Sequence, residues 1–195
     1  MSHRVIAGKA KGRRLQLVPG NKTRPIQDRA KEALFSILQD DVPGCYFLDV
    51  FAGTGAVGIE ALSRGASHAR FLDIDRMAIR TIHENLQITG LATAADVIQT
   101  DSLAYLRRHH VPHADIVYIA PPQYHGIWKK ALLAVDDNPV HLNPNALVVV
   151  QIDPDEEEPT ETRWLQRYDQ RRYGNTLLIF YEYEPETDQV ADSDT

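Results

Sequence analysis

The fold of this chain follows from one stretch, Phe47-Leu48-Asp49-Val50-Phe51-Ala52-Gly53-Thr54-Gly55-Ala56-Val57-Gly58-Ile59-Glu60-Ala61-Leu62. An apolar run from Tyr46 to Val50, with Asp49 near its end, predicts a buried strand that leads through glycines into a helix. Gly53 and Gly55 remove side chains where the backbone must turn sharply and where a ligand must come close. The helix start offers free N–H groups and the positive end of the helix dipole, so this turn suits a nucleotide-like ligand.

Strand and helix patterns alternate along the rest of the chain. We predict helices over residues 27–39, 77–87, 103–110 and 129–135, and strands over residues 69–75, 95–99, 115–119 and 146–152. The alternation predicts an α/β fold in which a mostly parallel sheet carries helices on both faces. A last strand over residues 176–184, after the Gly174-Asn175 turn, is expected to add an antiparallel edge.

The length of 195 residues suits one main domain, which we place at residues 25–184. Residues 1–24 are predicted to form a basic N-terminal β-hairpin extension, because two short apolar runs flank a glycine-punctuated basic turn. Residues 185–195 have the composition of an acidic, disordered tail.

The positive charge is concentrated at the N-terminus. The whole chain has a net charge of −6, but residues 1–39 hold nine Lys/Arg against two Asp/Glu, a net of +7. Such a segment on an acidic protein predicts a local contact with a polyanion, the alternative being a solvated basic loop. The candidate RNA-binding residues are Arg4, Lys9, Lys11, Arg13, Arg14 and Arg24.

Several classes of protein are excluded by the sequence. Cys45 is the single cysteine, so we expect a buried thiol with no disulfide framework. No apolar run is long enough to span a membrane and no signal peptide is visible, so we predict a cytoplasmic protein without membrane contact. His109, His110 and His113 cluster near Asp115, but their spacing matches no ligand pattern and we predict no metal site.

Polar residues follow successive predicted strands, where the ligands of such sheets bind. Gly53-Thr54-Gly55-Ala56-Val57-Gly58 matches a dinucleotide fingerprint, with Asp73 at the spacing of a ribose-binding acid, so NAD is one candidate ligand. Asp49 argues against NAD because its carboxylate would repel a pyrophosphate, and it favours the cationic amine of S-adenosylmethionine. Asp73 would then bind the ribose, and Asp101 with Ser102 the adenine edge. The predicted cofactor residues are Asp49, Gly53, Gly55, Asp73, Asp101 and Ser102, together with their neighbours Ala52, Thr54 and Ile74.

The stretch Ala120-Pro121-Pro122-Gln123-Tyr124 is the predicted catalytic turn. Two prolines fix a rigid extended turn after a strand, which leaves the carbonyls of Ala120 and Pro121 free to accept hydrogen bonds from an exocyclic amine. Tyr124 is expected to stack on the base that carries this amine. The competing interpretation is a structural Pro-Pro loop with a packed tyrosine.

With these motifs the chain resembles the RsmD-type methyltransferases, which methylate guanine N2 of small-subunit (16S) ribosomal RNA with S-adenosylmethionine. The resemblance covers nearly all of residues 4–184, and its most specific segment is Thr23-Arg24-Pro25-Ile26-Gln27-Asp28-Arg29-Ala30-Lys31-Glu32-Ala33-Leu34-Phe35. It implies a Rossmann-like class I methyltransferase fold of seven strands with an antiparallel last strand. By the same resemblance Phe51 would line the cofactor site, with Asp49, Gly53, Gly55, Asp73 and Asp101. It also implies that the basic N-terminus meets rRNA or an assembling 30S particle, and we expect a monomer.

One position departs from the family pattern. The family has Asp or Asn before Pro-Pro and an aromatic residue after it, whereas this chain has Ala120 and places Gln123 before Tyr124. The proline carbonyls with Gln123 could suffice, or Asp28 could reach the site. The third hypothesis is a protein that binds rRNA on this fold, as an assembly factor, without efficient catalysis.

Overall fold

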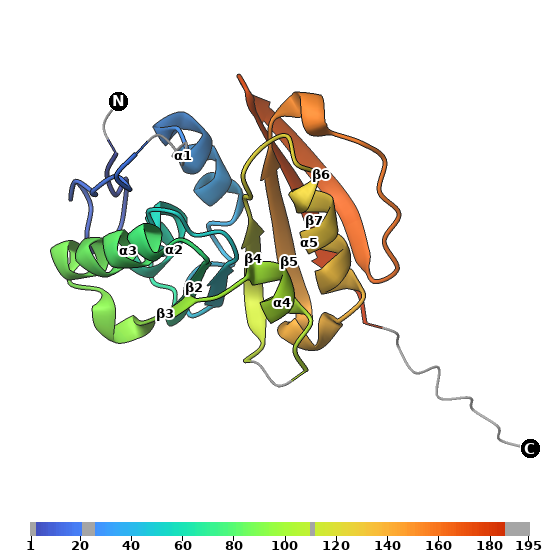
Figure 1. Cartoon of the computed structure of the whole chain (residues 1–195), viewed down its shortest axis with the longest axis horizontal. Coiled ribbons are helices and arrows are strands. Elements are labelled where there is room, and N and C mark those ends of the chain that lie inside the picture. Colours follow the sequence, from blue (N-terminus) through green and yellow to red (C-terminus); the bar gives the residue numbers. More distant parts are fainter. Residues whose placement is uncertain (1–2, 21–25, 110–111, 186–195) are drawn as a thin grey trace, which may run out of the picture.

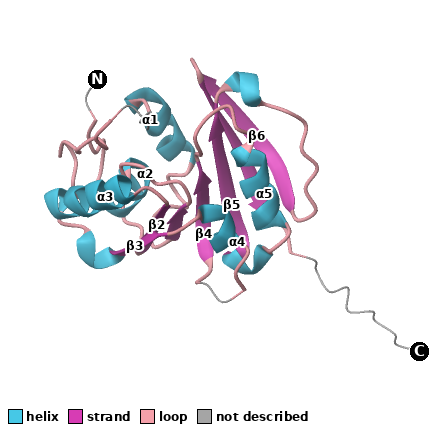
Figure 2. Ribbon diagram, in the orientation of Figure 1, coloured by secondary structure: helices cyan, strands magenta, loops and turns pink. Residues whose placement is uncertain are grey.

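Residues 3–20, 26–109 and 112–185 are described by the computed structural model (Figures 1 and 2). They form a seven-stranded sheet with the order β3-β2-β1-β4-β5-β7-β6. The strands are β1 (Tyr46–Asp49), β2 (His68–Asp73), β3 (Ala95–Gln99), β4 (Ala114–Ile119), β5 (Leu142–Ile152), β6 (Leu165–Tyr173) and β7 (Thr176–Tyr183). The helices are α1 (Asp28–Ile37), α2 (Ala56–Ser63), α3 (Arg76–Thr89), α4 (Ser102–Leu106) and α5 (Ile127–Asp136).

The sheet is parallel except for its last strand. β1 to β5 pair in parallel, and β7 inserts antiparallel between β5 and β6. This arrangement confirms the predicted α/β fold with an antiparallel last strand. Predicted boundaries differ by a few residues; for example, β5 begins at Leu142 rather than at Ala146 because Asn143 and Pro144 interrupt the apolar pattern.

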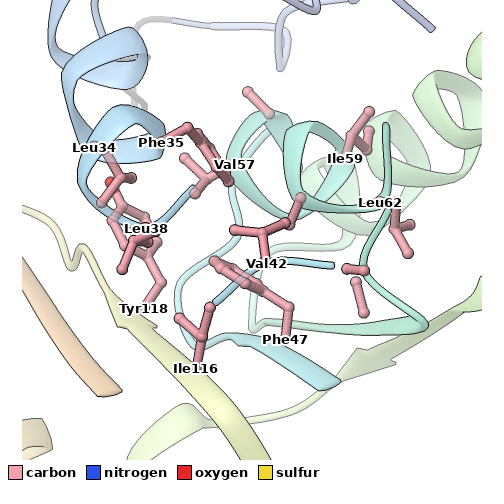
Figure 3. Packing of buried hydrophobic residues seen from close by; sticks show 14 of the residues in the cluster. Leu34, Phe35, Leu38, Val42, Phe47, Val57, Ile59, Leu62, Ile116 and Tyr118 are labelled. Carbon is pink, nitrogen blue, oxygen red and sulfur yellow. The ribbon is translucent and has the colours of Figure 1, made fainter. Parts of the chain in front are cut away.

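Helices cover both faces of the sheet (Figure 1). The first core cluster packs α1, α2 and α3 against one face, with Phe35, Phe47 and Ile59 each fully buried (Figure 3). The second cluster packs α4 and α5 against the other face, around Trp128 and Leu132. Burying such large side chains contributes roughly 1.5–3 kcal/mol each, so the parallel strands are held rigidly between two apolar layers.

The predicted N-terminal β-hairpin is not confirmed. Residues 3–20 contain one isolated antiparallel bridge, between Arg4 and Arg14, rather than two paired strands. Across this bridge Val5 donates to the carbonyl of Arg13 at 2.9 Å, and Leu15 donates to that of His3 at 2.8 Å. Ile6 and Ala7 donate instead to the Glu60 carboxylate of α2, at 2.8 and 2.9 Å. The pairing of the two arms therefore ends after one bridge, and contacts with α2 hold the rest of the segment.

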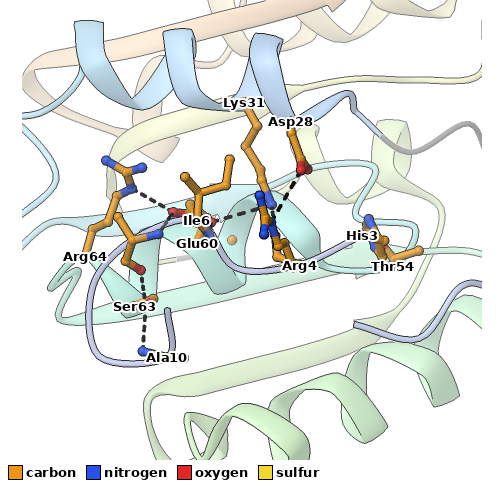
Figure 4. A network of polar contacts seen from close by, with 12 residues as sticks. His3, Arg4, Ile6, Ala10, Asp28, Lys31, Thr54, Glu60, Ser63 and Arg64 are labelled. Carbon is orange, nitrogen blue, oxygen red and sulfur yellow. Dashed lines mark hydrogen bonds and ion pairs between the residues drawn. The ribbon is translucent and has the colours of Figure 1, made fainter. Parts of the chain in front are cut away.

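A buried ion cluster fixes this segment to the domain (Figure 4). Glu60 is completely buried and accepts from Arg64 Nε at 2.8 Å, and its other oxygen lies 3.5 Å from Lys31 Nζ. Lys31 also donates to the carbonyl of Arg4 at 2.6 Å. Burial lowers the pKa of Lys31, and the Glu60 carboxylate opposes that shift. The N-terminal segment is therefore joined to α1 and α2 by charge-assisted hydrogen bonds.

Cys45 is a free, buried thiol, and burial raises its pKa to about 12. Within the described residues, the helices are too short or too polar to cross a bilayer.

Candidate functional site

The ends of five parallel strands surround one cavity of about 720 Å³. Each strand contributes a residue to the cavity wall at or just after its carboxyl end. The residues are, from β1 to β5, Asp49, Asp73, Asp101, Ala120 and Gln151. Open parallel sheets bind their ligands at this edge. The lining includes the predicted cofactor residues apart from Gly55, and it includes the predicted turn residues 120–123 but not Tyr124.

The glycines after β1 shape the turn in three ways. Gly53, with φ 55°, turns its N–H toward Asp73 and donates to Oδ2 at 2.8 Å. Gly55, with φ 75°, precedes α2, and a Cβ there would lie 3.2 Å from the Ile82 side chain. A Cβ on Gly58 would lie 2.3 Å from the Phe71 ring, so this glycine permits close packing of α2 on β2.

Asp49 lies at the floor of the cavity and is 1% exposed. Its Oδ2 accepts from the N–H of Gly58 at 3.2 Å, while Oδ1 has no partner among the described residues. Burial raises the pKa of this carboxyl to about 7, the Gly58 N–H opposes the shift, and nearby Asp73 adds to it. A buried carboxylate with an unused oxygen is a site prepared for a cationic partner.

Asp73 holds the glycine turn and the start of α3 together. One oxygen accepts from Gly53 and the other from the N–H of Asp75 at 2.8 Å. Burial raises the pKa of the Asp73 carboxyl. Each carboxylate oxygen has a second lone pair, so Asp73 can still accept from two neighbouring hydroxyl groups of a ligand.

Asp101 and Ser102 also have structural hydrogen bonds. Asp101 is the N-cap of α4 and accepts from the N–H of Ala104 at 2.8 Å. The Ser102 hydroxyl donates to the carbonyl of Val50. Both residues line the cavity, but the Ser102 proton is already used, so its remaining capacity toward a ligand is as an acceptor.

The turn after β4 places its residues in two directions. Ala120, Pro121, Pro122 and Gln123 line the cavity. Tyr124 has φ 65°, is 66% exposed, donates its N–H to Glu156 at 2.6 Å and donates its hydroxyl to Asp153 at 3.0 Å. Its ring therefore does not line the cavity as placed, and stacking on a base there requires these two hydrogen bonds to open.

Two polar residues that line the cavity, Tyr118 and Gln151, are not among the residues predicted from the sequence. Tyr118 on β4 donates its hydroxyl to Oε1 of Gln151 on β5 at 2.5 Å, and both residues line the cavity. Burial raises the pKa of Tyr118 well above its usual value, and the charge of Asp49 adds to the shift. A signal was present: Gln151 is the one polar residue in the apolar run 146–152.

The candidate RNA-binding cations lie on the N-terminal segment. Arg4, Lys9, Lys11, Arg13 and Arg14 are exposed, whereas Arg24 lies outside the described residues. Arg4 Nε is 3.6 Å from Oδ2 of Asp28. The segment reaches the cavity wall, because His3 Nε2 lies 2.9 Å from the Thr54 hydroxyl and Thr54 lines the cavity (Figure 4).

Among the described residues, no three or more His, Cys, Asp or Glu side chains are grouped so that they could hold a metal ion.

Comparison with known proteins identifies the family. A family model described as conserved hypothetical protein 95 matches residues 3–182. Ribosomal RNA small subunit methyltransferase D of Haemophilus influenzae is 36% identical over 163 residues, which span 83% of this chain and 84% of the relative. The chain belongs to the RsmD family. The relative of the same name as the Haemophilus protein in Escherichia coli K12 is 31% identical over 189 residues, which span 97% of this chain and 94% of that relative.

Solved structures agree with RsmD membership. An Escherichia coli protein described as a methyltransferase (yhhF) superposes with a TM-score of 0.83 at 30% identity, covering 94% of this chain and 99% of that one. An RNA methyltransferase from Salinibacter ruber, solved with S-adenosyl-L-homocysteine, gives a TM-score of 0.65 at 16% identity, covering 88% of this chain and 100% of that one. At that identity the likeness shows a shared fold.

The departure of this RsmD-family chain at position 120 can now be placed. Ala120 contributes a methyl group to the cavity wall where the resemblance led us to expect an acid or amide. Gln123 lines the same cavity, so it stays a candidate acceptor. Asp28 is not among the lining residues and is engaged with Arg4 at the start of α1, which disfavours it as a substitute.

Proposed function

We propose that this protein transfers a methyl group from S-adenosylmethionine to the exocyclic N2 of a guanine in small-subunit (16S) rRNA. The observation that carries the proposal is the convergence of three carboxylates and the Pro-Pro turn on one cavity, within a family whose relatives bear the name ribosomal RNA small subunit methyltransferase D. We further propose that it acts as a monomer, on rRNA or on an assembling 30S particle.

Each of the three carboxylates would bind a different part of S-adenosylmethionine. Asp49 would hold the cationic amine of the methionine part, because its buried oxygen Oδ1 has no partner among the described residues. Asp73, beside the glycine turn, would accept from the ribose hydroxyls, and Asp101 would meet the adenine edge. The same Asp49 would repel the pyrophosphate of NAD, so we expect titration calorimetry to show binding of S-adenosylmethionine and none of NAD.

The reaction requires orientation more than a reactive side chain. The N2 lone pair attacks the methyl carbon, the bond from carbon to sulfur breaks, and its electron pair returns to the sulfonium. One proton of N2 then leaves to water in the open cavity. Holding the two reacting atoms in line converts a collision into a step within one complex, which can lower the barrier by roughly 7–11 kcal/mol.

The exposed cations of the N-terminal segment would bind RNA phosphates outside the cavity, since the turn that holds Lys9 packs on Ser63 at the last residue of α2. Lys9, Lys11, Arg13 and Arg14 are exposed, and phosphate contacts of this kind position an RNA without reading its sequence. The target guanine would leave its stack to enter the cavity, as bases do when an enzyme must reach an atom within them. Tyr124 would then be free to stack on the guanine after leaving Asp153.

Labelled S-adenosylmethionine, small-subunit RNA without base methylation, and intact 30S particles test this proposal. We expect label on guanine N2, mapped by nuclease digestion and mass spectrometry, at one position. Label on another atom would refute the guanine-N2 assignment, and absence of label beside an active control enzyme would refute methyl transfer.

The second candidate is a catalytically weak or inert rRNA-binding or assembly protein. Ala120 favours it, because the turn after β4 offers a methyl group at that position. Filter binding of the same RNA, measured beside the methylation assay, separates the two candidates. Tight binding without turnover would support the inert protein, and robust turnover would exclude it.

A further inference from the structure

The proposed reaction needs hydrogen-bond acceptors around the target amine. The lone pair of an exocyclic amine is delocalised into its ring, and acceptors on the N–H groups help to localise it for attack. In this chain the turn after β4 supplies backbone carbonyls, while the side chain of Ala120 has no polar atom. The side-chain acceptor must therefore come from a neighbouring element of the cavity wall.

The sheet register brings one polar side chain next to Ala120. Ile119 of β4 pairs with Val150 of β5 in parallel, so the next residues, Ala120 and Gln151, follow side by side. Residues paired across parallel strands face the same side of the sheet. Both residues line the cavity, so we infer that the Gln151 amide and a longer side chain at position 120 would reach the same part of the wall.

Tyr118 fixes the orientation of that amide. Its side chain is 2% exposed and its hydroxyl donates to Oε1 of Gln151. The carbonyl oxygen of an amide has two lone pairs, so Oε1 can accept from Tyr118 and from a second donor at the same time. A buried phenol that donates to Oε1 restricts the rotamers of the glutamine, which lowers the entropy lost on binding.

We propose that Gln151 is the side-chain acceptor for the target amine and so compensates for Ala120, with Tyr118 as its positioning residue. This inference rests on the proposed methyl transfer. The neutral amide holds one N2–H but takes no proton; that proton leaves to water after transfer. Its NH2 group can in addition donate to N3 of guanine, which lies next to N2 on the same edge of the base.

Two near-isosteric variants test the role of Gln151. Gln151→Met keeps the length of the side chain and removes the acceptor, and we expect the single-turnover rate to fall about 10–100-fold, as for a buried hydrogen-bonding group that loses its partner. The dissociation constant for S-adenosylmethionine, from calorimetry, should stay within about twofold of the native value. Gln166→Met, on the exposed face of β6, is the matched control and should keep the native rate.

The conservative variant supplies a readout that a structural role would not change. Gln151→Glu restores acceptor oxygens, so its rate at high pH should exceed that of Gln151→Met at least about tenfold, and it should decline as the pH falls and the new carboxylate is protonated. In the Gln151→Met background, Ala120→Asp should recover rate, because the two side chains reach the same amine.

The outcomes separate this inference from the proposed function. An inactive native chain would overturn both. An active native chain whose Gln151→Met variant keeps its rate, or loses rate and cofactor affinity in equal measure, would overturn the role of Gln151 alone. A Gln151→Glu variant without the new pH dependence, or a double variant no faster than Gln151→Met, would likewise place the acceptor elsewhere. Thermal unfolding of every variant shows whether it folds.

Discussion

The two halves of the cavity differ in the residues that form their walls and in how freely those residues could be exchanged. In the cofactor half, β1 and β2 end in Asp49 and Asp73, and Asp101 follows β3 by two residues. Each of these carboxylates also accepts a backbone hydrogen bond that holds the scaffold. In the half beside β4 and β5, the wall combines an alanine, two prolines and an amide. A cofactor presents the same groups in every catalytic cycle, so the carboxylates that would bind it are needed at fixed positions. A target amine needs only one acceptor close to it, and the end of either β4 or β5 can supply that acceptor.

The cofactor half is also clamped by the N-terminal segment, and removing that clamp should have the largest effect. Glu60→Ala leaves Lys31 buried without its anion and removes the acceptor of two backbone N–H groups. We expect the free energy of unfolding to fall by about 3–5 kcal/mol, as for one partner of a buried ion pair.

Urea titration followed by circular dichroism measures this change, and Glu84→Ala is the matched control. Glu84 pairs with Arg80 on an exposed surface of α3, so its loss should cost less than about 1 kcal/mol. Equal losses in the two variants would show that the Glu60 cluster does not anchor the segment.

Within the cofactor half, Asp49→Asn should weaken S-adenosylmethionine binding about 100-fold. Asparagine can still accept from Gly58, but it has no charge for the cationic amine. The same substitution should raise the melting temperature of the free protein near pH 8, because it removes a buried carboxylate. Calorimetry and thermal unfolding measure both effects, with exposed Asp137→Asn as control. An unchanged affinity would show that Asp49 does not bind the cationic amine of S-adenosylmethionine.

Because burial raises the pKa of Asp49 to about 7, both the stability of the free protein and the affinity of the cofactor half for S-adenosylmethionine should depend on pH. Because the folded-state pKa exceeds the unfolded one, this carboxyl contributes stability at low pH that is lost as the pH rises from about 4 to 7. Cofactor binding favours the ionised form, so affinity should increase about tenfold between pH 6 and pH 8. Calorimetry across this range should show the trend in the native chain and not in Asp49→Asn; a flat native profile would contradict it.

Sequence patterns predicted the fold because it depends on local signals that repeat. Apolar strands, glycine turns and amphipathic helices recur from β1 to β5, and the comparisons confirm the family that their motifs suggested. The predicted hairpin had the same kind of local signal. Val5 and Leu15 do donate across its two arms, but the pairing stops at one bridge. Beyond that bridge, Ile6 and Ala7 donate to Glu60, more than fifty residues away, a contact that no local pattern indicates.

The site shows the same limit. Asp49 and Asp73 could be found because each follows an apolar run, and the structure places both on the cavity wall. Tyr118 and Gln151 could not be paired from the sequence, since their contact depends on the register between β4 and β5. Likewise, the aromatic residue of the turn was visible, but its hydrogen bond to Asp153, far along the chain, was not.

The smallest expected effect concerns the half beside β4 and β5, and it tests whether the two strand ends there supply one interaction. If Gln151 already serves the amine, then Ala120→Asp in the otherwise native chain should change the single-turnover rate by less than about threefold, because a second acceptor has little left to stabilise. The same substitution in an inert binding protein would create activity where the native chain has none. Measured on 30S particles beside Gln151→Met and the double variant, a rate increase above about tenfold would show that the native wall lacks an acceptor. A small change there, with a large rescue in the double variant, would show that the two strand ends supply one interaction between them.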